Sequence, residues 1–431
     1  MMNRKLIAWL LATIMVFAFF AAAIGPSTAA REKTTVVEPA IVWQDTYGDD
    51  DLFAHDVIQT SDGNFAATGE FIFFSPSGLE GGAIFLLKAA GADGEKLCQT
   101  FESHGLARFY DGEFIQQTED GYVVAGSGTE LLPPTSFFYL VKYDENGNVL
   151  WSNSYRPVGG NSQCTGATAT PDGGYLLVGY TIEPSSASYA YVVKTDALGN
   201  KQWDTVITDP AGLGVSSSIP RSVTNAPGGY AITGEVLNEE TGLNEAFLLR
   251  LNTHGKVITT EHYVFALPDT LRTELDGASI QYTKDGFIIA GRAYGYGLIG
   301  INAKAAFLLK VSVNGNIRWY NTYGRDTFSG ASSVAQTVDG GYILTGTTNF
   351  ITAGSPIYAY IARTDSDGNL LWSKTISGKT IGPIVVPYAT ASGSKVKVTS
   401  DGGYIVAGMA VPGGSSDTLL VRLAPDIVPL S

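Results

Sequence analysis

Short apolar runs and turn sequences alternate along most of the chain in a regular order. In one representative stretch, apolar segments at 166–170, 175–181, 189–194 and 201–203 are separated by a turn ending in Gly173-Gly174, a polar loop and a turn ending in Gly199-Asn200. Such turns supply the positive φ values of tight hairpins, so the four runs predict four antiparallel strands. Each stretch of this kind is expected to form one four-stranded meander.

The second strand of each predicted meander lacks the alternation of apolar and polar residues that is typical of a half-exposed strand. It reads Tyr-Leu-Leu-Val from Tyr175 and Tyr-Ile-Val-Ala from Tyr404. Continuous apolar runs imply that both faces of each sheet are covered. Because no helical pattern is present to cover them, the sheets are expected to stack face to face, about 10 Å apart, and to close into a ring.

The meander is repeated seven times. Each copy has an aromatic residue four positions before a glycine, and successive glycines, called the repeat glycines below, lie 57, 53, 55, 57, 55 and 62 residues apart. The seven pairs are Phe65/Gly69, Tyr122/Gly126, Tyr175/Gly179, Tyr230/Gly234, Phe287/Gly291, Tyr342/Gly346 and Tyr404/Gly408. A period of this length indicates one repeated supersecondary unit rather than several unrelated domains.

The two ends of the repeat array are incomplete in complementary ways. The seventh copy stops after Leu423 without a fourth strand, whereas residues 41–48 (Ile-Val-Trp-Gln-Asp-Thr-Tyr-Gly) match the fourth strand at 317–324 (Ile-Arg-Trp-Tyr-Asn-Thr-Tyr-Gly). The N-terminal strand is expected to complete the last sheet, which closes the ring and removes an exposed edge. The predicted fold is all-β: a seven-bladed β-propeller of four-stranded antiparallel blades.

These repeats resemble those of secreted bacterial and archaeal β-propeller-repeat proteins, which read approximately T-x-D-G-G-Y-I-V-A-G and A-Y-L-V-K-x-D-x-x-G-N-x-x-W. The resemblance covers residues 41–423 and is closest at 399–408 and 139–151. Segments 144–151, 196–203 and 365–372 are also similar to the tryptophan-docking repeats of quinoprotein dehydrogenases. Those enzymes commonly have an adjacent cysteine pair near the quinone, but Cys98 and Cys164 lie 66 positions apart, so no cofactor is expected.

The N-terminus has the features of a secretory signal peptide. Residues 1–30 contain a basic start, an apolar run over 6–24 and small residues up to Ala30. Residues 31–40 are interpreted as a linker, and 41–431 as a single propeller domain. The protein is therefore expected outside the cell or at its surface. An uncleaved membrane anchor is the alternative, because the apolar run approaches the roughly 20 residues that cross a bilayer.

The net charge limits the classes of partner, and the positions of the cysteines bear on disulfide formation. A formal net charge of −14 argues against nucleic acid and against acidic lipid headgroups, since no basic stripe is available to neutralise phosphates. Cys98 stands where other repeats have Trp, and Cys164 lies in a different part of its repeat. The two cysteines are therefore expected to be free thiols rather than a disulfide.

Three recurrent features are interpreted as structural. A basic residue ends the third strand of every repeat and is expected to extend its charge into water along a packed stem; the seven are Lys88, Lys142, Lys194, Arg250, Lys310, Arg363 and Arg422. Asp144 and Asp365 begin turns that resemble the start of a calcium loop, but no acid stands at the twelfth position, so turn geometry is favoured over weak calcium binding. The four histidines, His55, His104, His254 and His262, show no metal-binding spacing.

No catalytic, cofactor-binding or metal-binding residue is assigned from the sequence. The connections between second and third strands, and between repeats, vary in length and should share one face of the ring, where binding sites often lie. That face is expected to carry Phe71–Phe74, Leu131–Thr135, Tyr294–Tyr296 and Asn349–Ile351. Their aromatic residues either contact a ligand or pack on one another.

Two classes of function follow from these expectations. The first is a non-catalytic binding or cell-surface interaction module that contacts a protein or glycan ligand through the variable-loop face. The alternative is an extracellular enzyme that acts on polysaccharide or another polymer at the central channel. Two or three convergent carboxyl groups with raised pKa in that channel would favour the enzyme.

Overall fold

The computed structural model describes residues 34–429 except 49–50, 75–79, 106–107, 132, 159, 183–186, 210–216, 298–300, 325–326, 328, 350–354 and 382–383. The expected signal peptide, 1–30, lies outside the described residues. Residues 38–426 form one compact unit, and the described residues on either side belong to a second. In that second unit β1 (Thr34–Val36) pairs antiparallel with β32 (Ile427–Pro429). None of the described segments is a helix long and apolar enough to cross a bilayer.

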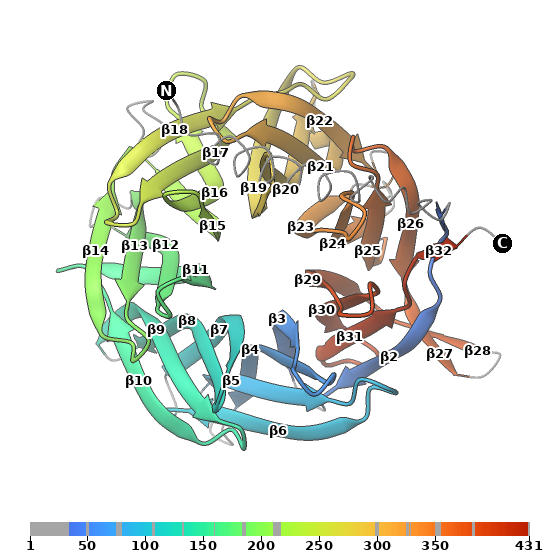
Figure 1. The fold of residues 1–431 in the computed structure, drawn as a ribbon, viewed down its shortest axis with the longest axis horizontal. Helices are drawn as coiled ribbons and strands as arrows, with labels where there is room; N and C mark the ends of the chain where they lie inside the picture. Colours follow the sequence, from blue (N-terminus) through green and yellow to red (C-terminus); the bar gives the residue numbers. More distant parts are fainter. Residues whose placement is uncertain are drawn as a thin grey trace, which may run out of the picture. The chain divides into compact units, whose positions relative to one another are not determined.

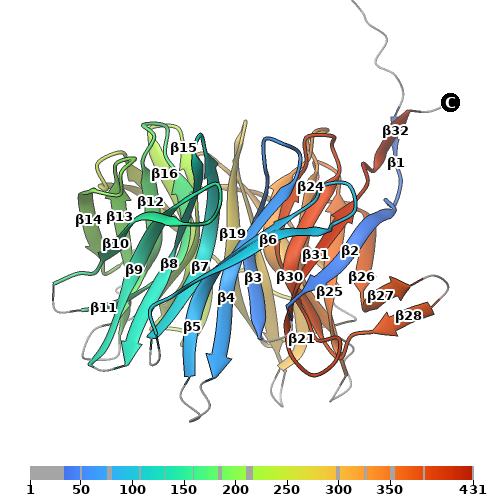
Figure 2. The same ribbon diagram turned by 90° about the horizontal axis from the view of Figure 1, so that it is seen from below.

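Residues 38–426 form the predicted seven-bladed β-propeller (Figure 1). Each blade is a four-stranded antiparallel sheet whose first strand in the repeat lies innermost and whose fourth lies at the rim. From the inside outward, the blades are β3 (Leu52–Gln59), β4 (Phe65–Phe74), β5 (Glu80–Ala89), β6 (Lys96–Ser103); β7 (Arg108–Thr118), β8 (Gly121–Leu131), β9 (Pro134–Asp144), β10 (Val149–Tyr155); β11 (Asn161–Ala169), β12 (Tyr175–Ile182), β13 (Ser188–Thr195), β14 (Lys201–Ile207); β15 (Ser218–Ala226), β16 (Gly229–Asn238), β17 (Leu243–Asn252), β18 (Val257–Tyr263); β19 (Arg272–Thr283), β20 (Gly286–Tyr296), β21 (Ile301–Ser312), β22 (Ile317–Tyr323); β23 (Gly330–Gln336), β24 (Tyr342–Asn349), β25 (Ile357–Thr364), β26 (Leu370–Ile376); and β29 (Ala391–Val398), β30 (Tyr404–Ala410), β31 (Asp417–Leu423), β2 (Ile41–Tyr47). A further hairpin, β27 (Gly378–Ile381) and β28 (Ile384–Pro387), projects outward between the sixth and seventh blades (Figure 2).

The N-terminal strand closes the ring, as predicted. β2 pairs with β31 from Ile41 opposite Leu423 to Tyr47 opposite Thr418. Trp43 and Tyr47 are buried in a core cluster that joins the seventh blade to Phe65 and Phe85 of the first blade. The face-to-face packing expected from the continuous apolar runs therefore continues between the seventh and the first blade.

The outer strand of one blade docks on the turn between the third and fourth strands of the next blade. Tyrosine hydroxyls donate hydrogen bonds to glycine carbonyls of those turns in four blade pairs: Tyr47–Gly94, Tyr155–Gly199, Tyr263–Gly315 and Tyr323–Gly368. Indole rings lie against turn glycines in four pairs: Trp43–Gly94, Trp151–Gly199, Trp203–Gly255 and Trp319–Gly368. A methyl group on these glycines would lie only 2.6–2.7 Å from the indole carbons, which explains why Gly and Trp recur together.

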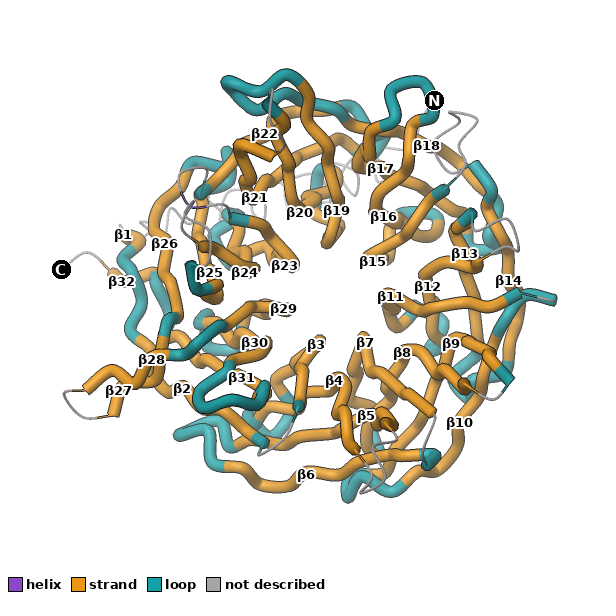
Figure 3. Tube along the Cα trace, turned by 180° about the vertical axis from the view of Figure 1, so that it is seen from behind, coloured by secondary structure: helices purple, strands orange, loops and turns teal. Residues whose placement is uncertain are grey.

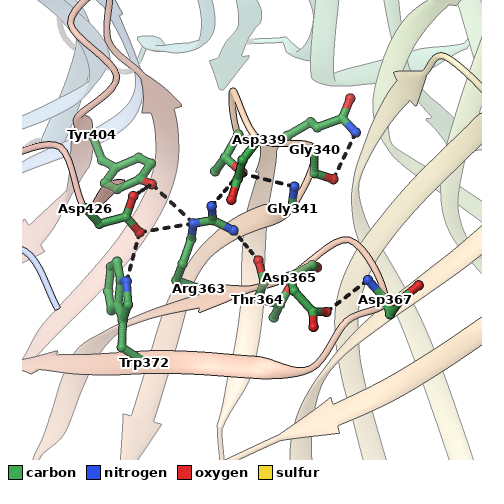
Figure 4. Close-up of polar contacts among 12 residues, drawn as sticks. Asp339, Gly340, Gly341, Arg363, Thr364, Asp365, Asp367, Trp372, Tyr404 and Asp426 are labelled. Carbon is green, nitrogen blue, oxygen red and sulfur yellow. Dashed lines mark hydrogen bonds and ion pairs between the residues drawn. The ribbon is translucent and has the colours of Figure 1, made fainter. Parts of the chain in front are cut away.

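Asp426 takes the place of that turn at the closing junction (Figure 4). The seventh blade lacks a turn after β31 because its fourth strand comes from the N-terminus. The buried Asp426 carboxylate instead accepts hydrogen bonds from Trp372 Nε1 at 2.9 Å and Tyr404 OH at 2.7 Å. It also accepts one from Arg363 Nε at 3.1 Å. A buried ion pair therefore fixes the sixth blade to the seventh.

The expectation that the repeated basic residues extend into water is wrong for six of the seven, which are buried. Five of them pair with the aspartate of the first hairpin turn in their own blade, although their side chains are almost completely buried: Lys142–Asp120 (2.6 Å), Lys194–Asp172 (2.8 Å), Lys310–Asp285 (2.7 Å), Arg363–Asp339 (2.6 Å) and Arg422–Asp401 (2.6 Å). Where the fourth repeat lacks this aspartate, Arg250 donates instead to the carbonyls of Pro227 and Val313. The physical reason is that the turn aspartate lies within reach, and its hydrogen bond from Lys194 lowers the pKa of Asp172 to about 2.

Candidate functional site

Every innermost strand contains a β-bulge opposite a repeat glycine. The pairing register between the first and second strands shifts next to the repeat glycine. As a result, one residue of the inner strand has no partner on the second strand. These bulge residues are His55, Glu113, Thr165, Arg221, Ala278, Ser332 and Ser394. A bulge redirects a side chain out of the regular alternation, and such features are enriched beside functional sites.

The repeat glycines are required by these bulges. A methyl group on any of the seven would lie 1.7–2.0 Å from a carbonyl oxygen of the inner strand, such as that of Asp111 for Gly126. No side chain fits at that separation. Each repeat glycine therefore allows its blade to direct one bulge residue toward the channel. The type of that residue can differ from blade to blade.

Replacement of a repeat glycine is expected to destabilise the propeller by steric conflict. Gly126→Ala should lower the free energy of unfolding by about 1–3 kcal/mol, the usual cost of overpacking a dense interior. Gly413→Ala is the control, because a methyl group there meets no atom within 4 Å. Denaturant unfolding measures both variants, and equal stability of the two would contradict a steric role for Gly126.

All seven bulge residues line one cavity of about 480 Å³. The innermost strands that carry them surround the centre of the ring (Figure 3). Its volume lies in the range of sites for small ligands. Ala278, Ser332 and Ser394 place small side chains at the bulge positions of three consecutive blades. Charged side chains line the cavity from the first, second, fourth, fifth and seventh blades, so the cavity combines open volume with fixed charge.

Two residues of the cavity wall, His55 and Glu113, belong to a cluster of one histidine and three carboxyl groups from the first two blades. His55 Nδ1 lies 3.0 Å from Asp111 Oδ1 and 3.6 Å from Glu113 Oε1. About a quarter of each of these three side chains is exposed. Glu70, the residue after the first repeat glycine, is close enough to interact electrostatically with both His55 and Asp111. The structure thus brings together carboxyl groups that the sequence alone does not relate.

Burial and neighbouring charges raise the pKa of three members of this cluster: Glu70, Glu113 and His55. Burial raises the pKa of Glu70 to about 7, and the charge of Asp111 adds to that rise. Burial also raises the pKa of Glu113, although the charge of His55 opposes it. Burial alone would lower the pKa of His55, but the charges of Asp111 and Glu113 outweigh it and raise the pKa to about 10. Of these two carboxyl groups with raised pKa, Glu113 lines the cavity and Glu70 does not, so the channel wall holds one of them.

Basic residues occupy other blades around the same cavity. Arg221, Arg292, Lys395 and Lys397 all line it. Arg221 is 2.6 Å from Glu235, whereas Arg221 and Arg292 lie 3.7 and 3.5 Å from the oxygens of Asp276. More than a third of both arginine side chains remains exposed. Their guanidinium groups therefore keep donors that can reach a ligand.

Comparison with known proteins supports the fold but identifies no family for this chain. No protein-family profile and no curated protein matches the chain. The polysaccharide lyase Uly1 has a similar structure, with a TM-score of 0.56 and 11% identity over 91% of this chain and 100% of that one. A protein of unknown function from Dyadobacter fermentans (TM-score 0.46, 13% identity, 91% and 99% covered) and a europium-containing methanol dehydrogenase (TM-score 0.44, 10% identity, 93% and 95% covered) are also similar. The similarity to Uly1 supports the fold of this chain.

The segments expected to form the variable-loop face lie largely in strands. Phe71–Phe74 ends β4 and Tyr294–Tyr296 ends β20, because the second and third strands continue to pair beyond the predicted loops. Phe71 packs against Phe73 and Phe101. Tyr296 donates a hydrogen bond to Glu274. Of the other segments, Leu132, Phe350 and Ile351 lie outside the described residues. Contacts within a blade therefore account for Phe71, Phe73 and Tyr296, whereas Phe74 is exposed.

The turns that resemble calcium loops have their carboxylates occupied by the turn itself. Asp365 accepts hydrogen bonds from the amides of Asp367 and Asn369 at 2.9 and 2.8 Å. Asp144 accepts equivalent bonds from Asn146 and Asn148. This is the turn geometry that the sequence favoured. Cys98 and Cys164 are free thiols, also as expected.

The bulge residues of the channel were not identified from the sequence because no local motif marks them. His55 stands 14 positions before Gly69, and Glu113 stands 13 before Gly126. The other bulge residues likewise lie 13 or 14 positions before their repeat glycines. That spacing is the signal that could have identified the ring.

Proposed function

We propose that the protein is an exported propeller that binds an anionic glycan in its central channel without transforming it. The single observation that carries this proposal is the ring of seven bulge residues, one from each blade and of six residue types, that line one cavity. Repeated scaffold positions combined with one varied inward position per blade are the arrangement expected of a recognition site. The proposed binding site is therefore the central channel, whereas the sequence suggested the variable-loop face.

The chemistry of the cavity supports an anionic, hydroxyl-rich ligand. Although the whole chain has a net charge of −14, four basic side chains line this cavity together with only two carboxylates, Glu113 and Asp276. Hydroxyl and amide groups of Thr165, Ser332 and Gln281 are also present. Guanidinium and ammonium groups bind carboxylates or sulfates, and the hydroxyl and amide groups match sugar hydroxyls. Uly1, a polysaccharide lyase with this fold, makes a polysaccharide ligand a reasonable first class to test.

Calorimetric titration of the full chain with an oligogalacturonide and with a neutral cello-oligosaccharide tests the proposal. The acidic sugar should bind, and the neutral one should bind weakly or not at all. The double variant Arg292→Ala/Lys395→Ala should weaken binding by at least about tenfold, because hydrogen bonds to charged groups contribute about 1.5–3 kcal/mol each. Lys201→Ala, an exposed lysine of the outer strand β14, is the control. Equal binding of both sugars, or an unaffected double variant, would refute the proposal.

Catalysis in the same cavity is the second candidate, favoured by the convergence of Glu70, Asp111 and Glu113 with His55. Paired carboxyl groups are the usual machinery for cleaving glycosidic bonds. Chromatography of the sugar after prolonged incubation separates the two functions. Multiple turnovers of product, lost in Glu113→Gln, would establish the enzyme and exclude a purely binding role.

A further inference from the structure

We propose that His55, Asp111 and Glu113 bind one divalent transition-metal ion, such as Zn²⁺, at the wall of the central channel. The three residues come from two adjacent blades: His55 is the bulge residue of β3, and Glu113 is the bulge residue of β7. Their ligand atoms all lie within 4.8 Å of one another. Among the described residues they form the sole histidine and carboxylate group with this geometry.

The spacing of the three atoms fits a common central ion. Two ligands about 2.1 Å from a tetrahedral zinc ion lie about 3.4 Å apart. His55 Nδ1 is 3.0 Å from the Asp111 oxygen and 3.6 Å from the Glu113 oxygen, which brackets that value. The Asp111 and Glu113 oxygens lie within 4.8 Å of each other, so side-chain rotation would bring all three atoms to bonding distance from one ion.

The hydrogen-bond pattern also points to a common central group. His55 Nδ1 and Asp111 Oδ1 are both buried atoms, yet neither has a hydrogen-bond partner among the described residues. They are close enough for a hydrogen bond but are not aligned for one. Buried polar atoms are normally satisfied. Two buried atoms that form an ion pair without an aligned hydrogen bond can both act as ligands of one ion once His55 releases its proton.

The ligand set indicates the class of ion. Imidazole nitrogen favours zinc, copper, iron and nickel, whereas carboxylate oxygen alone favours magnesium, calcium and manganese. One nitrogen and two carboxylate oxygens suit a borderline ion such as Zn²⁺. Because His55 and Glu113 line the cavity, an ion between them would be accessible from it. If the proposed function holds, the ion adds a positive charge to that of Arg221 and Arg292 and would coordinate a carboxylate of the bound sugar.

Metal binding alone tests this inference, so its outcome is independent of any sugar. The full chain is stripped with EDTA and titrated with Zn²⁺ in a calorimeter. One ion per chain should bind. His55→Gln and Asp111→Asn should each weaken binding by at least about a hundredfold, since even groups that only hydrogen-bond to metal ligands contribute 10–100-fold. His262→Gln is the matched control, because His262 lies 2.5 Å from a single carboxylate, Glu245, and it should bind zinc like the wild type.

A crystal of the wild-type protein soaked in Zn²⁺ provides a readout that needs no variant to fold. The strongest anomalous peak should lie between His55, Asp111 and Glu113. Absence of binding in the calorimeter, a peak elsewhere, or equal affinity in His55→Gln and the wild type would each overturn the site. Zinc binding without any sugar binding would leave this site established and refute only the proposed function.

Discussion

Removal of β2 is expected to lower the melting temperature by at least about 10 °C. A chain that begins at residue 48 loses the fourth strand of the seventh blade, including the buried Trp43 and Tyr47. Truncation of one buried aromatic side chain costs about 3–5 kcal/mol, and the whole propeller is expected to have only about 5–15 kcal/mol of stability. The loss also exposes the edge of β31 to other chains.

A chain that begins at residue 38 is the matched control for this truncation. It retains β2 and the ion pair between Glu38 and Lys374. Differential scanning calorimetry should show a melting temperature close to that of the full chain for this control and a large decrease for the shorter chain. Equal melting of the two truncated chains would contradict closure by β2.

Asp426→Ala is expected to cost about 3 kcal/mol, at the lower end of the range for breaking a buried ion pair from one side. Arg363 and Asp426 are both fully buried. Asp339 still pairs with Arg363 after the change, which limits the loss. The carboxylate also accepts the Trp372 and Tyr404 hydrogen bonds, so three donors lose an acceptor at once (Figure 4).

Asp367→Ala is the control for the loss of Asp426, since Asp367 is an exposed residue of a hairpin turn. Urea unfolding should show little change for Asp367→Ala and a decreased midpoint for Asp426→Ala. Trp372→Phe should have an intermediate effect of about 1 kcal/mol through the loss of one hydrogen bond. A stability of Asp426→Ala within experimental error of the wild type would show that the junction does not depend on this carboxylate.

The fold was predictable because its determinants are local and repeated. The turn glycines, the continuous apolar runs and the recurrence of Tyr and Trp in the fourth strand identify seven meanders. The complementary ends identify the closure by residues 41–47. The burial and pairing of the basic residues could not be predicted from the strand pattern alone. Whether Lys194 faces water or pairs with Asp172 depends on the distance between the end of one strand and a turn of the same blade.

The candidate site was less predictable because it is assembled from positions far apart in the chain. His55 and Asp111 are 3.0 Å apart in space, but 56 positions separate them in the sequence. The repeat glycines were visible at once, yet their steric role follows only from the bulge that each one permits. The varied residues opposite them are therefore where function is expected, while the repeated ones account for the scaffold.

A crystal structure of the protein with a bound acidic oligosaccharide would show whether the bulge residues form the binding site. Density for the sugar is expected in the channel cavity, with its acidic group near Arg221 and Arg292 and the ring of bulge residues around it. Density for the sugar on the outer surface of the blades, with the channel cavity free of it, would contradict the assignment of the bulge ring as the functional site.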